Sequence, residues 1–271
     1  MSFRNVREGE KPVADLTVLL TVYRRNTLQR LLAALAEQTI VPREVVVYHD
    51  CDFQRIPKKK LIRQGIQVTE NSFNTRYHGR FAYLFNTPTE WLAVLDDDVI
   101  PGPGCLENYL NQSRDLGAIV GGLGRLCYTN PEREKLERPA DQGVRPEPVL
   151  VDFVGQMWVF PKRLLFDMFS IEPSTYLTGE DMHLCFASKL KSGVRSYVAA
   201  QRSIDESCDV TMGEYAGDKF ASFRGTPKAD RAAVEEHFHQ LGVNFITRAE
   251  QLRAQEELPA TWRHTEPRSL G

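Results

Sequence analysis

The sequence predicts a single-domain α/β fold in which helices flank a mixed, mostly parallel sheet. Apolar runs that are typical of buried strands alternate with amphipathic helical segments through the first half of the chain. The run Trp91–Leu95 is apolar without a break, as expected for a strand that is buried on both faces of a parallel sheet. With 271 residues, the chain is long enough to bury one substantial core.

The first predicted unit is a strand followed by an amphipathic helix. The strand covers Leu16–Tyr23, which is almost wholly apolar. We expect Asn26 to cap the helix, because Gln29 stands three residues later, as in a capping box. The helix then carries leucines at the spacing of a single face, which packs on the sheet: Leu28, Leu31, Leu32 and Leu35.

Three further strands and a helix complete the first half. Val45–Tyr48 and Ile66–Thr69 have strand character, and the apolar residues between Tyr77 and Phe85 follow a helical spacing. The strand Trp91–Leu95 comes next. The resulting order of strand, helix, strand, strand, helix and strand is typical of a parallel α/β sheet.

The second half alternates less regularly. Helices are expected over Cys105–Asn111, from Pro161, from Asp181 to Gly193, over Pro227–Leu241 with Thr226 as cap, and over Thr247–Glu257. Strands are expected over 118–126, 149–160 and 194–199. Residues 129–148 are rich in proline and charge and lack periodicity, which predicts a long loop of the kind that serves as a lid or a binding loop.

Three adjacent carboxylates, Asp96, Asp97 and Asp98, follow the central strand directly. Each desolvated charge would cost several kcal/mol in a core, so we expect them at the carboxyl end of the strand, where open α/β sheets bind ligands. Their hard oxygens suit Mg²⁺ or Mn²⁺. A second acidic pair opens a later helix, where Thr178 and Asp181 form a potential capping box that leaves Glu180 unexplained.

Composition excludes several classes of protein. A net charge of −2 argues against nucleic acid as a partner. The five cysteines form no CxxC pair, which favours a reducing compartment and no zinc site. No apolar run approaches a transmembrane segment, so a cytoplasmic location is expected, with peripheral membrane contact compatible with it. The basic run near Pro57 is interpreted as a solvated face.

Six motifs resemble those of a GT-A glycosyltransferase, and most of all the exostosin-like α-N-acetylhexosaminyltransferase family. They are TVYRRNTLQRLL from Thr21, VVVYHD, NSFNTR, LDDDV, GEDMHLCF and RGTPKADRAAVEEHF. The resemblance implies a Rossmann-like GT-A domain over residues 15–245, with a nucleotide-binding half (15–100) and an acceptor half (101–245). Residues 1–14 would be a flexible N-terminus, and 246–271 a C-terminal helix and tail.

The resemblance implies a metal-dependent hexosyl- or N-acetylhexosaminyltransferase of polysaccharide biosynthesis. It would move a sugar from a UDP-sugar to a glycan or lipid-linked glycan acceptor, with retention of the anomeric configuration. Asp98 would bind Mn²⁺ or Mg²⁺. The donor would contact eight residues: Thr21, Tyr23, Arg24, Asp50, Asn71, Arg76, Asp96 and Asp97. Asp50 would accept the N3–H of uracil, and Asp96 would reach the ribose.

Asp181 and Arg231 are the catalytic candidates. Arg231 favours retention, because a cation in the family's C-terminal helix position would stabilise the departing diphosphate. An inverting enzyme with Asp181 as general base is the nearest alternative. A sugar-nucleotidyltransferase is less favoured, because the turn after the first strand contains no glycine. A non-catalytic carbohydrate-binding protein would need neither acidic motif.

Overall fold

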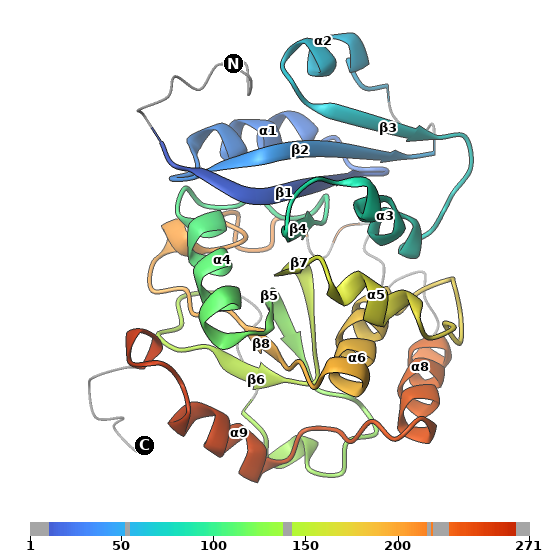
Figure 1. Cartoon of the computed structure of the whole chain (residues 1–271), viewed down its shortest axis with the longest axis vertical. Helices are drawn as coiled ribbons and strands as arrows, with labels where there is room; N and C mark the ends of the chain where they lie inside the picture. Colours follow the sequence, from blue (N-terminus) through green and yellow to red (C-terminus); the bar gives the residue numbers. More distant parts are fainter. Residues whose placement is uncertain (1–10, 52–54, 138–142, 216–217, 219–227, 264–271) are drawn as a thin grey trace.

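Among the described residues, one eight-stranded sheet runs through the molecule in the order β3-β2-β1-β4-β7-β5-β8-β6 (Figure 1). The structure is a computed structural model, and it describes residues 11–51, 55–137, 143–215, 218 and 228–263. The strands are β1 (Val13–Val22), β2 (Val41–Asp50), β3 (Gln67–Asn71), β4 (Trp91–Leu95), β5 (Ile119–Arg125), β6 (Val149–Val151), β7 (Phe153–Pro161) and β8 (Ser196–Val198).

Strand direction places several loop regions at one edge of the sheet. β1, β2, β3 and β4 are all parallel to one another through successive pairs. β7 is antiparallel to both β4 and β5, so β4 and β5 point the same way, and β8 is parallel to β5. The short edge strand β6 is antiparallel to β8. The predicted mixed, mostly parallel sheet is therefore confirmed.

Helices cover both faces of the sheet. The helices are α1 (Leu28–Glu37), α2 (Lys58–Arg63), α3 (His78–Tyr83), α4 (Cys105–Leu116), α5 (Leu164–Phe169), α6 (Glu180–Ser192), α8 (Lys228–Gln240) and α9 (Arg248–Glu256). Short 3₁₀ helices span Leu84–Asn86, Arg133–Lys135, Ile204–Glu206 and Ala260–Trp262.

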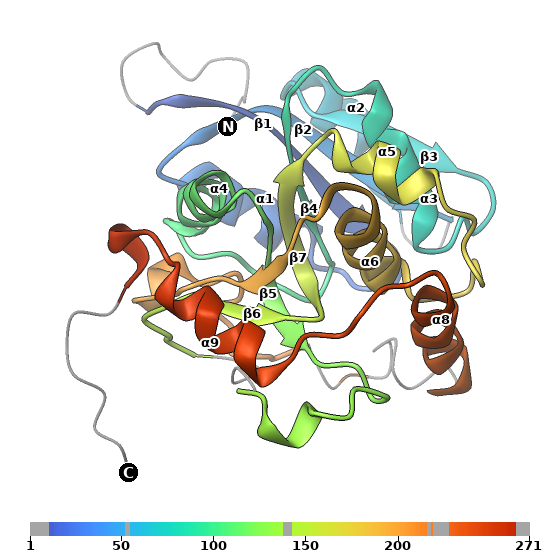
Figure 2. The ribbon, with the colours of Figure 1, turned by 60° about the horizontal axis from the view of Figure 1, so that its bottom comes forward.

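Two core clusters show which helices share a face. One contains residues of α1, α2 and α4, and the other contains residues of α3, α5, α6 and α8. Figure 2 shows α8 beside α6 and α9 along β6. No helix in the described part of the chain is long and apolar enough to cross a membrane. The expected cytoplasmic location remains a prediction.

Local differences from the expected elements have physical causes. The cap of α1 is Thr27 in place of Asn26, and its side-chain hydroxyl donates to the Asp97 carbonyl oxygen (2.8 Å) instead of to the helix. The expected strand 149–160 is divided at Asp152, whose carboxylate accepts backbone N–H groups of Cys127 and Ile246. Helix α9 begins after Thr247, whose side chain forms a capping box with Glu250, and this start agrees with the expected range Thr247–Glu257.

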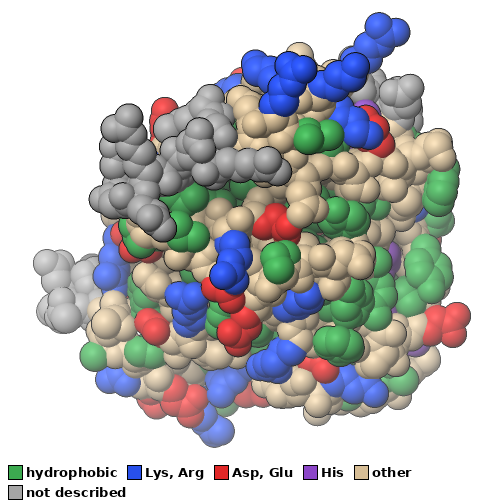
Figure 3. All heavy atoms as spheres, turned by 45° about the horizontal axis from the view of Figure 1, so that its top comes forward, with side chains coloured by type: hydrophobic (Ala, Val, Ile, Leu, Met, Phe, Trp, Pro, Cys, Tyr) green, Lys and Arg blue, Asp and Glu red, His purple; other side chains and the backbone are tan. Residues whose placement is uncertain are grey.

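The basic run after Pro57 forms helix α2, which the sequence did not predict as a helix. Its three lysines, Lys58, Lys59 and Lys60, are exposed, and lysine and arginine side chains gather at the top of the view in Figure 3. The described part of the expected loop 129–148 is anchored. Glu132 accepts from the Arg248 backbone, and Gln251 donates to the Glu137 carbonyl oxygen. Residues 1–10 and the expected cap Thr226 lie outside the described residues.

Candidate active site

The three carboxylates lie at the carboxyl end of β4, as the sequence predicted. β4 is buried, and the chain turns immediately after it at Asp96. The Asp96 N–H donates to the Gln156 carbonyl oxygen of β7 (2.9 Å), which fixes where the carboxylates begin. Gln156 has a φ of +67°, a left-handed conformation that is unfavourable for a side-chain-bearing residue. The backbone of β7 is therefore held in an uncommon shape directly beside the acidic motif.

A pocket of about 120 Å³ opens in front of these carboxylates. It gathers residues from the ends of β1, β2 and β4 and from the loop after β3: Thr21, Tyr23, Arg25, Asp50, Asn74, Arg76, Tyr77, Asp96, Asp97 and Asp98. Seven of the predicted site residues thus share one pocket, because the carboxyl ends of parallel strands meet at a single edge.

One side of the pocket is ordered around Asp50. Its Oδ1 accepts from the Thr75 backbone (3.1 Å), the Thr75 hydroxyl (2.8 Å) and the Asn71 amide (3.4 Å). Asp50 is thereby held with its carboxylate facing the pocket. Asn71 does not line the pocket, so the structure places it as a support for Asp50.

Arg25, and not Arg24, reaches the carboxylates. The Arg24 guanidinium lies 5.0 Å from the Tyr23 ring centroid and is absent from the pocket lining. Arg25 is buried, and its guanidinium forms ion pairs with Asp97 (2.5 Å) and Asp218 (2.8 Å) and lies 3.6 Å from Asp98. Arg25 was not among the residues singled out from the sequence, and the expected contact of Arg24 with the donor stays a prediction.

Asp98 has the properties that a divalent cation site requires. Its Oδ1 is buried and has no hydrogen-bond partner among the described residues. Burial and the neighbouring charge of Asp96 raise the pKa of Asp98 to about 7, against the opposing effect of Arg25. A buried carboxylate oxygen that lacks a donor, beside further carboxylates, fits a hard cation such as Mg²⁺ or Mn²⁺.

The described residues do not form a complete set of metal ligands. Within the described ranges, no group of three or more His, Cys, Asp or Glu side chains is arranged to hold an ion. Mg²⁺ is commonly bound through one or two carboxylates, with substrate phosphates completing the coordination. The residues around Asp98 therefore fit an ion that binds together with a diphosphate.

Arg80 joins the two acidic motifs, and sequence analysis missed it. Its guanidinium forms one ion pair with Asp96 and a second with Glu180, 100 residues away in the chain (2.9 Å), and it also donates to the Thr21 hydroxyl (2.9 Å). The side chain is 3% exposed and lies 5.0 Å from the Trp158 ring centroid. The available signal was an arginine among the apolar residues that follow a helical spacing between Tyr77 and Phe85.

Glu180, which a capping box left unexplained, is the buried partner of Arg80. Burial first and the Asp181 charge second raise the pKa of Glu180 to about 7, while Arg80 opposes the rise. The helix α6 itself begins after Gly179, and no side chain caps it. The expected Thr178–Asp181 capping box is therefore not formed, and the Asp181 Oδ1 instead accepts the N–H of Met182 in the first turn of α6 (2.8 Å).

Asp181 lies on the same side of the sheet edge as the Asp96–Asp98 cluster. A Cβ placed on Gly155 of β7 would be 4.0 Å from the Asp181 Oδ2, and the next residue, Gln156, bonds to Asp96. The Asp181 carboxylate forms an ion pair with Arg231 (2.8 Å). Arg231 is not among the residues that line the carboxylate pocket, and its expected role beside a departing diphosphate stays a prediction.

The contact between Asp181 and Arg231 depends on a glycine. Gly179 has a φ of +81°, which a residue with a side chain rarely adopts. A Cβ at this position would also lie 2.8 Å from a Val234 methyl carbon of α8. The glycine therefore allows α8 to pack against the start of α6, which brings Arg231 to Asp181.

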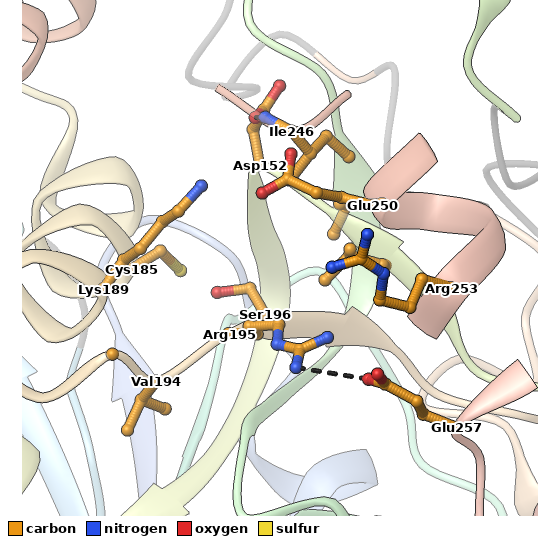
Figure 4. Close-up of a pocket in the computed structure, with 13 residues that line it drawn as sticks. Asp152, Cys185, Lys189, Val194, Arg195, Ser196, Ile246, Glu250, Arg253 and Glu257 are labelled. Atoms are coloured by element: carbon orange, nitrogen blue, oxygen red, sulfur yellow. Dashed lines mark hydrogen bonds and ion pairs between the residues drawn. The ribbon is translucent and has the colours of Figure 1, made fainter. Parts of the chain in front are cut away.

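A larger pocket, of about 350 Å³, lies between α6, α9, β6 and β8 (Figure 4). Its acidic side chains already have partners: Asp152 accepts backbone N–H groups, Glu250 closes the α9 capping box, and Glu257 pairs with Arg195 (3.5 Å). None of the predicted catalytic residues lines it. The carboxylates of Asp96, Asp97 and Asp98 line the smaller pocket instead.

This sheet, with an acidic triplet at a strand end and a second acidic motif at a helix start, defines a glycosyltransferase of the GT-A fold. Residues 17–168, more than half of the chain, match the family described as Glycosyl transferase family 2. The protein belongs to that family. A comparison with curated protein sequences gave no significant match.

Solved structures support the fold. The mannosyltransferase PcManGT from Pyrobaculum calidifontis, in complex with GDP-Man and Mn²⁺, has a TM-score of 0.57 and 17% identity, over 93% of this chain and 72% of that one. S. aureus TarS 1–349 in complex with UDP-GlcNAc has a TM-score of 0.54 and 16% identity, over 90% of this chain and 70% of that one. The present chain spans 37% of a longer TarS structure. The finer resemblance to the exostosin-like family remains a prediction.

Proposed function

We propose that the protein transfers a sugar from a nucleoside-diphosphate sugar to a hydroxyl group of a glycan or lipid-linked glycan, with a divalent cation at Asp98. The observation that carries the proposal is the buried, unpartnered Asp98 Oδ1 beside a pocket lined with carboxylates and arginines. A bound Mn²⁺ or Mg²⁺ would supply a Lewis acid that neutralises the diphosphate. The complexes of the two neighbours, one with UDP-GlcNAc and one with GDP-Man, support a nucleotide-sugar donor.

UDP is our first choice of nucleotide. Asp50 lines the pocket, and its Oδ1 is fully used by Thr75 and Asn71. Its Oδ2 makes no hydrogen bond to any described residue, so it can accept the N3–H of uracil. Arg76 lines the same pocket, and its guanidinium is suited to binding a phosphate. The thermal-shift screen of donors tests whether the transferred sugar is a hexosyl or an N-acetylhexosaminyl group.

We propose further that Asp181 acts as the general base, so that transfer inverts the anomeric carbon. The proposal is supported by the ion pair between Arg231 and Asp181, which can hold this carboxylate in one orientation. Asp181 would take the proton of the acceptor hydroxyl while the oxygen of that hydroxyl forms a bond to C1 of the sugar. The bond from C1 to the phosphate oxygen breaks in the same step, and the diphosphate leaves with the electron pair.

A thermal-shift screen tests the donor. Samples contain UDP, UDP-GlcNAc, UDP-glucose or GDP-mannose, each with Mn²⁺, Mg²⁺ or EDTA. The right donor at a hundredfold excess over its dissociation constant should stabilise the protein by about 2.7 kcal/mol, and only with the metal. Equal melting temperatures in all samples would contradict the proposal. NMR of the first-formed product then reports the anomeric configuration, and a retained configuration would contradict the role of Asp181 as base.

A further inference from the structure

The chain that follows β5 brings an exposed tyrosine to the acceptor side of the active site. β5 points the same way as β4, and β7 lies between them. Tyr128, which follows β5, therefore lies at the same sheet edge as Asp96–Asp98, about 10 Å to the side at the usual strand spacing. Its side chain is 59% exposed. A flat aromatic face is thus open to solvent beside the two acidic motifs.

Helix α8 fixes Tyr128 relative to the proposed base. Glu235 is fully buried and accepts the backbone N–H groups of Tyr128 (3.0 Å) and Thr129 (3.1 Å). Arg231 is one turn earlier on the same helix face and pairs with Asp181 (2.8 Å). The Asp181 charge raises the pKa of Arg231 most, against the effect of burial. Helix α8 therefore bonds both to the Tyr128 backbone and to the Asp181 carboxylate.

Arg133 lies beside Tyr128 and has no ionic partner among the residues that the structure describes. Its guanidinium lies 4.8 Å from the Tyr128 ring centroid. Among the described residues, its side chain has no hydrogen bond or ion pair, and its Nε is buried without an acceptor. A buried donor that lacks a partner is destabilising, so the position points to an acceptor group that a ligand brings.

Nearby carboxylates do not supply that group. Glu235 is held by the amides of Tyr128 and Thr129, Asp152 accepts from Cys127 and Ile246, and Glu132 accepts from Arg248. Each is committed to backbone N–H groups. The side chain of Arg133 is half-buried, so its remaining donors can be reached from solvent.

We propose that Tyr128 and Arg133 form an acceptor subsite for a carbohydrate that carries an anionic group, either a phosphate or a carboxylate. The acceptor ring packs on the Tyr128 face, and its anion binds Arg133. This arrangement presents a hydroxyl group toward Asp181. The proposal rests on the proposed function and specifies the chemical class of its acceptor.

NMR titrations in the presence of UDP and Mn²⁺ test the subsite with three matched probes: methyl glucoside, its 6-phosphate and methyl glucuronide. At least one charged probe should bind about tenfold more tightly than the neutral one, as expected for a charged hydrogen bond. Comparing the affinity of the 6-phosphate with that of methyl glucuronide shows which anion is preferred. Arg133→Gln should abolish the preference, and Tyr128→Ala should weaken every probe that binds.

Arg253→Gln is the matched control. Arg253 is an exposed arginine that lines the separate pocket of Figure 4 and has no ion pair among the described residues. This variant should keep the preference. UDP binding with Mn²⁺ is measured on every sample, so a wild-type protein that fails to bind UDP contradicts the proposed function. If UDP binds but the charged probes bind no better than the neutral one, or do not bind, the subsite alone is refuted. A preference that survives Arg133→Gln refutes it as well.

Discussion

Replacing Arg80 by methionine removes the side chain that joins the two acidic motifs of the active site. Asp96 would lose its ion pair, and the deeply buried Glu180 would lose its cation. Breaking a buried pair by removing one partner typically costs about 3–5 kcal/mol, because an uncompensated charge stays buried. A whole domain is stable by about 5–15 kcal/mol, so Arg80→Met should remove a large fraction of the free energy of unfolding.

Urea-induced unfolding measures this loss. Arg43→Met is the matched control, because Arg43 is 58% exposed and pairs with Asp15 at the surface (2.8 Å). That pair should contribute at most about 1 kcal/mol. The double variant Arg80→Met/Glu180→Gln should recover part of the loss, since it no longer buries an unpaired Glu180 carboxylate.

A cost below about 1 kcal/mol for Arg80→Met would refute the reasoning, because it would equal that of a surface pair. Should Arg80→Met fail to fold, Arg80→Lys provides the measurement. A lysine keeps the charge but presents a single ammonium, which cannot bond to Asp96 and Glu180 in the forked geometry of arginine. We therefore expect a smaller but clear loss of stability for Arg80→Lys.

Three further predictions concern the carboxylates. The folded-state pKa of Glu180 is raised from 4.5 to about 7, so the free energy of unfolding should fall as pH rises through that window, and Glu180→Gln should flatten the profile in calorimetry. An unchanged slope would contradict the burial of this group. Asp98→Asn should abolish Mn²⁺-dependent UDP binding by calorimetry with little change in the melting temperature, since Asp98 Oδ1 has no hydrogen-bond partner among the described residues and Arg25 keeps its shorter ion pairs with Asp97 and Asp218; tight binding by the variant would refute the metal assignment. Asp181→Asn should slow transfer by about 10²- to 10⁴-fold while leaving UDP binding intact, and a wild-type rate would exclude Asp181 as base.

Several features of the site follow from local physical chemistry, and the sequence predicted those. A continuous apolar run must be buried, and three charges after it must leave the core, so Trp91–Leu95 and Asp96–Asp98 were placed correctly. The fold class followed from the alternation of strand and helix patterns. The expected helix Thr247–Glu257 agrees with α9, whose start is fixed by a capping box between residues three positions apart.

Features that depend on two distant side chains were missed or misassigned. The sequence offered Arg24 and Arg25 as neighbours, and only the direction of the chain after β1 decided that Arg25 reaches the carboxylates. The Thr178–Asp181 box satisfied a local rule that the packing of α8 against Gly179 overrides. Arg231 was expected near a phosphate, and the structure pairs it with Asp181.

The sequence by itself determined where charge must emerge from the core, because the cost of desolvation acts on each residue wherever it lies in the chain. Only the tertiary structure decided which charges face one another. Arg80 and Glu180 stand 100 residues apart, and they meet because α3 and α6 share a sheet face and β7 lies beside β4. Coulomb interactions depend on distance in space, and the order of strands in the sheet sets that distance.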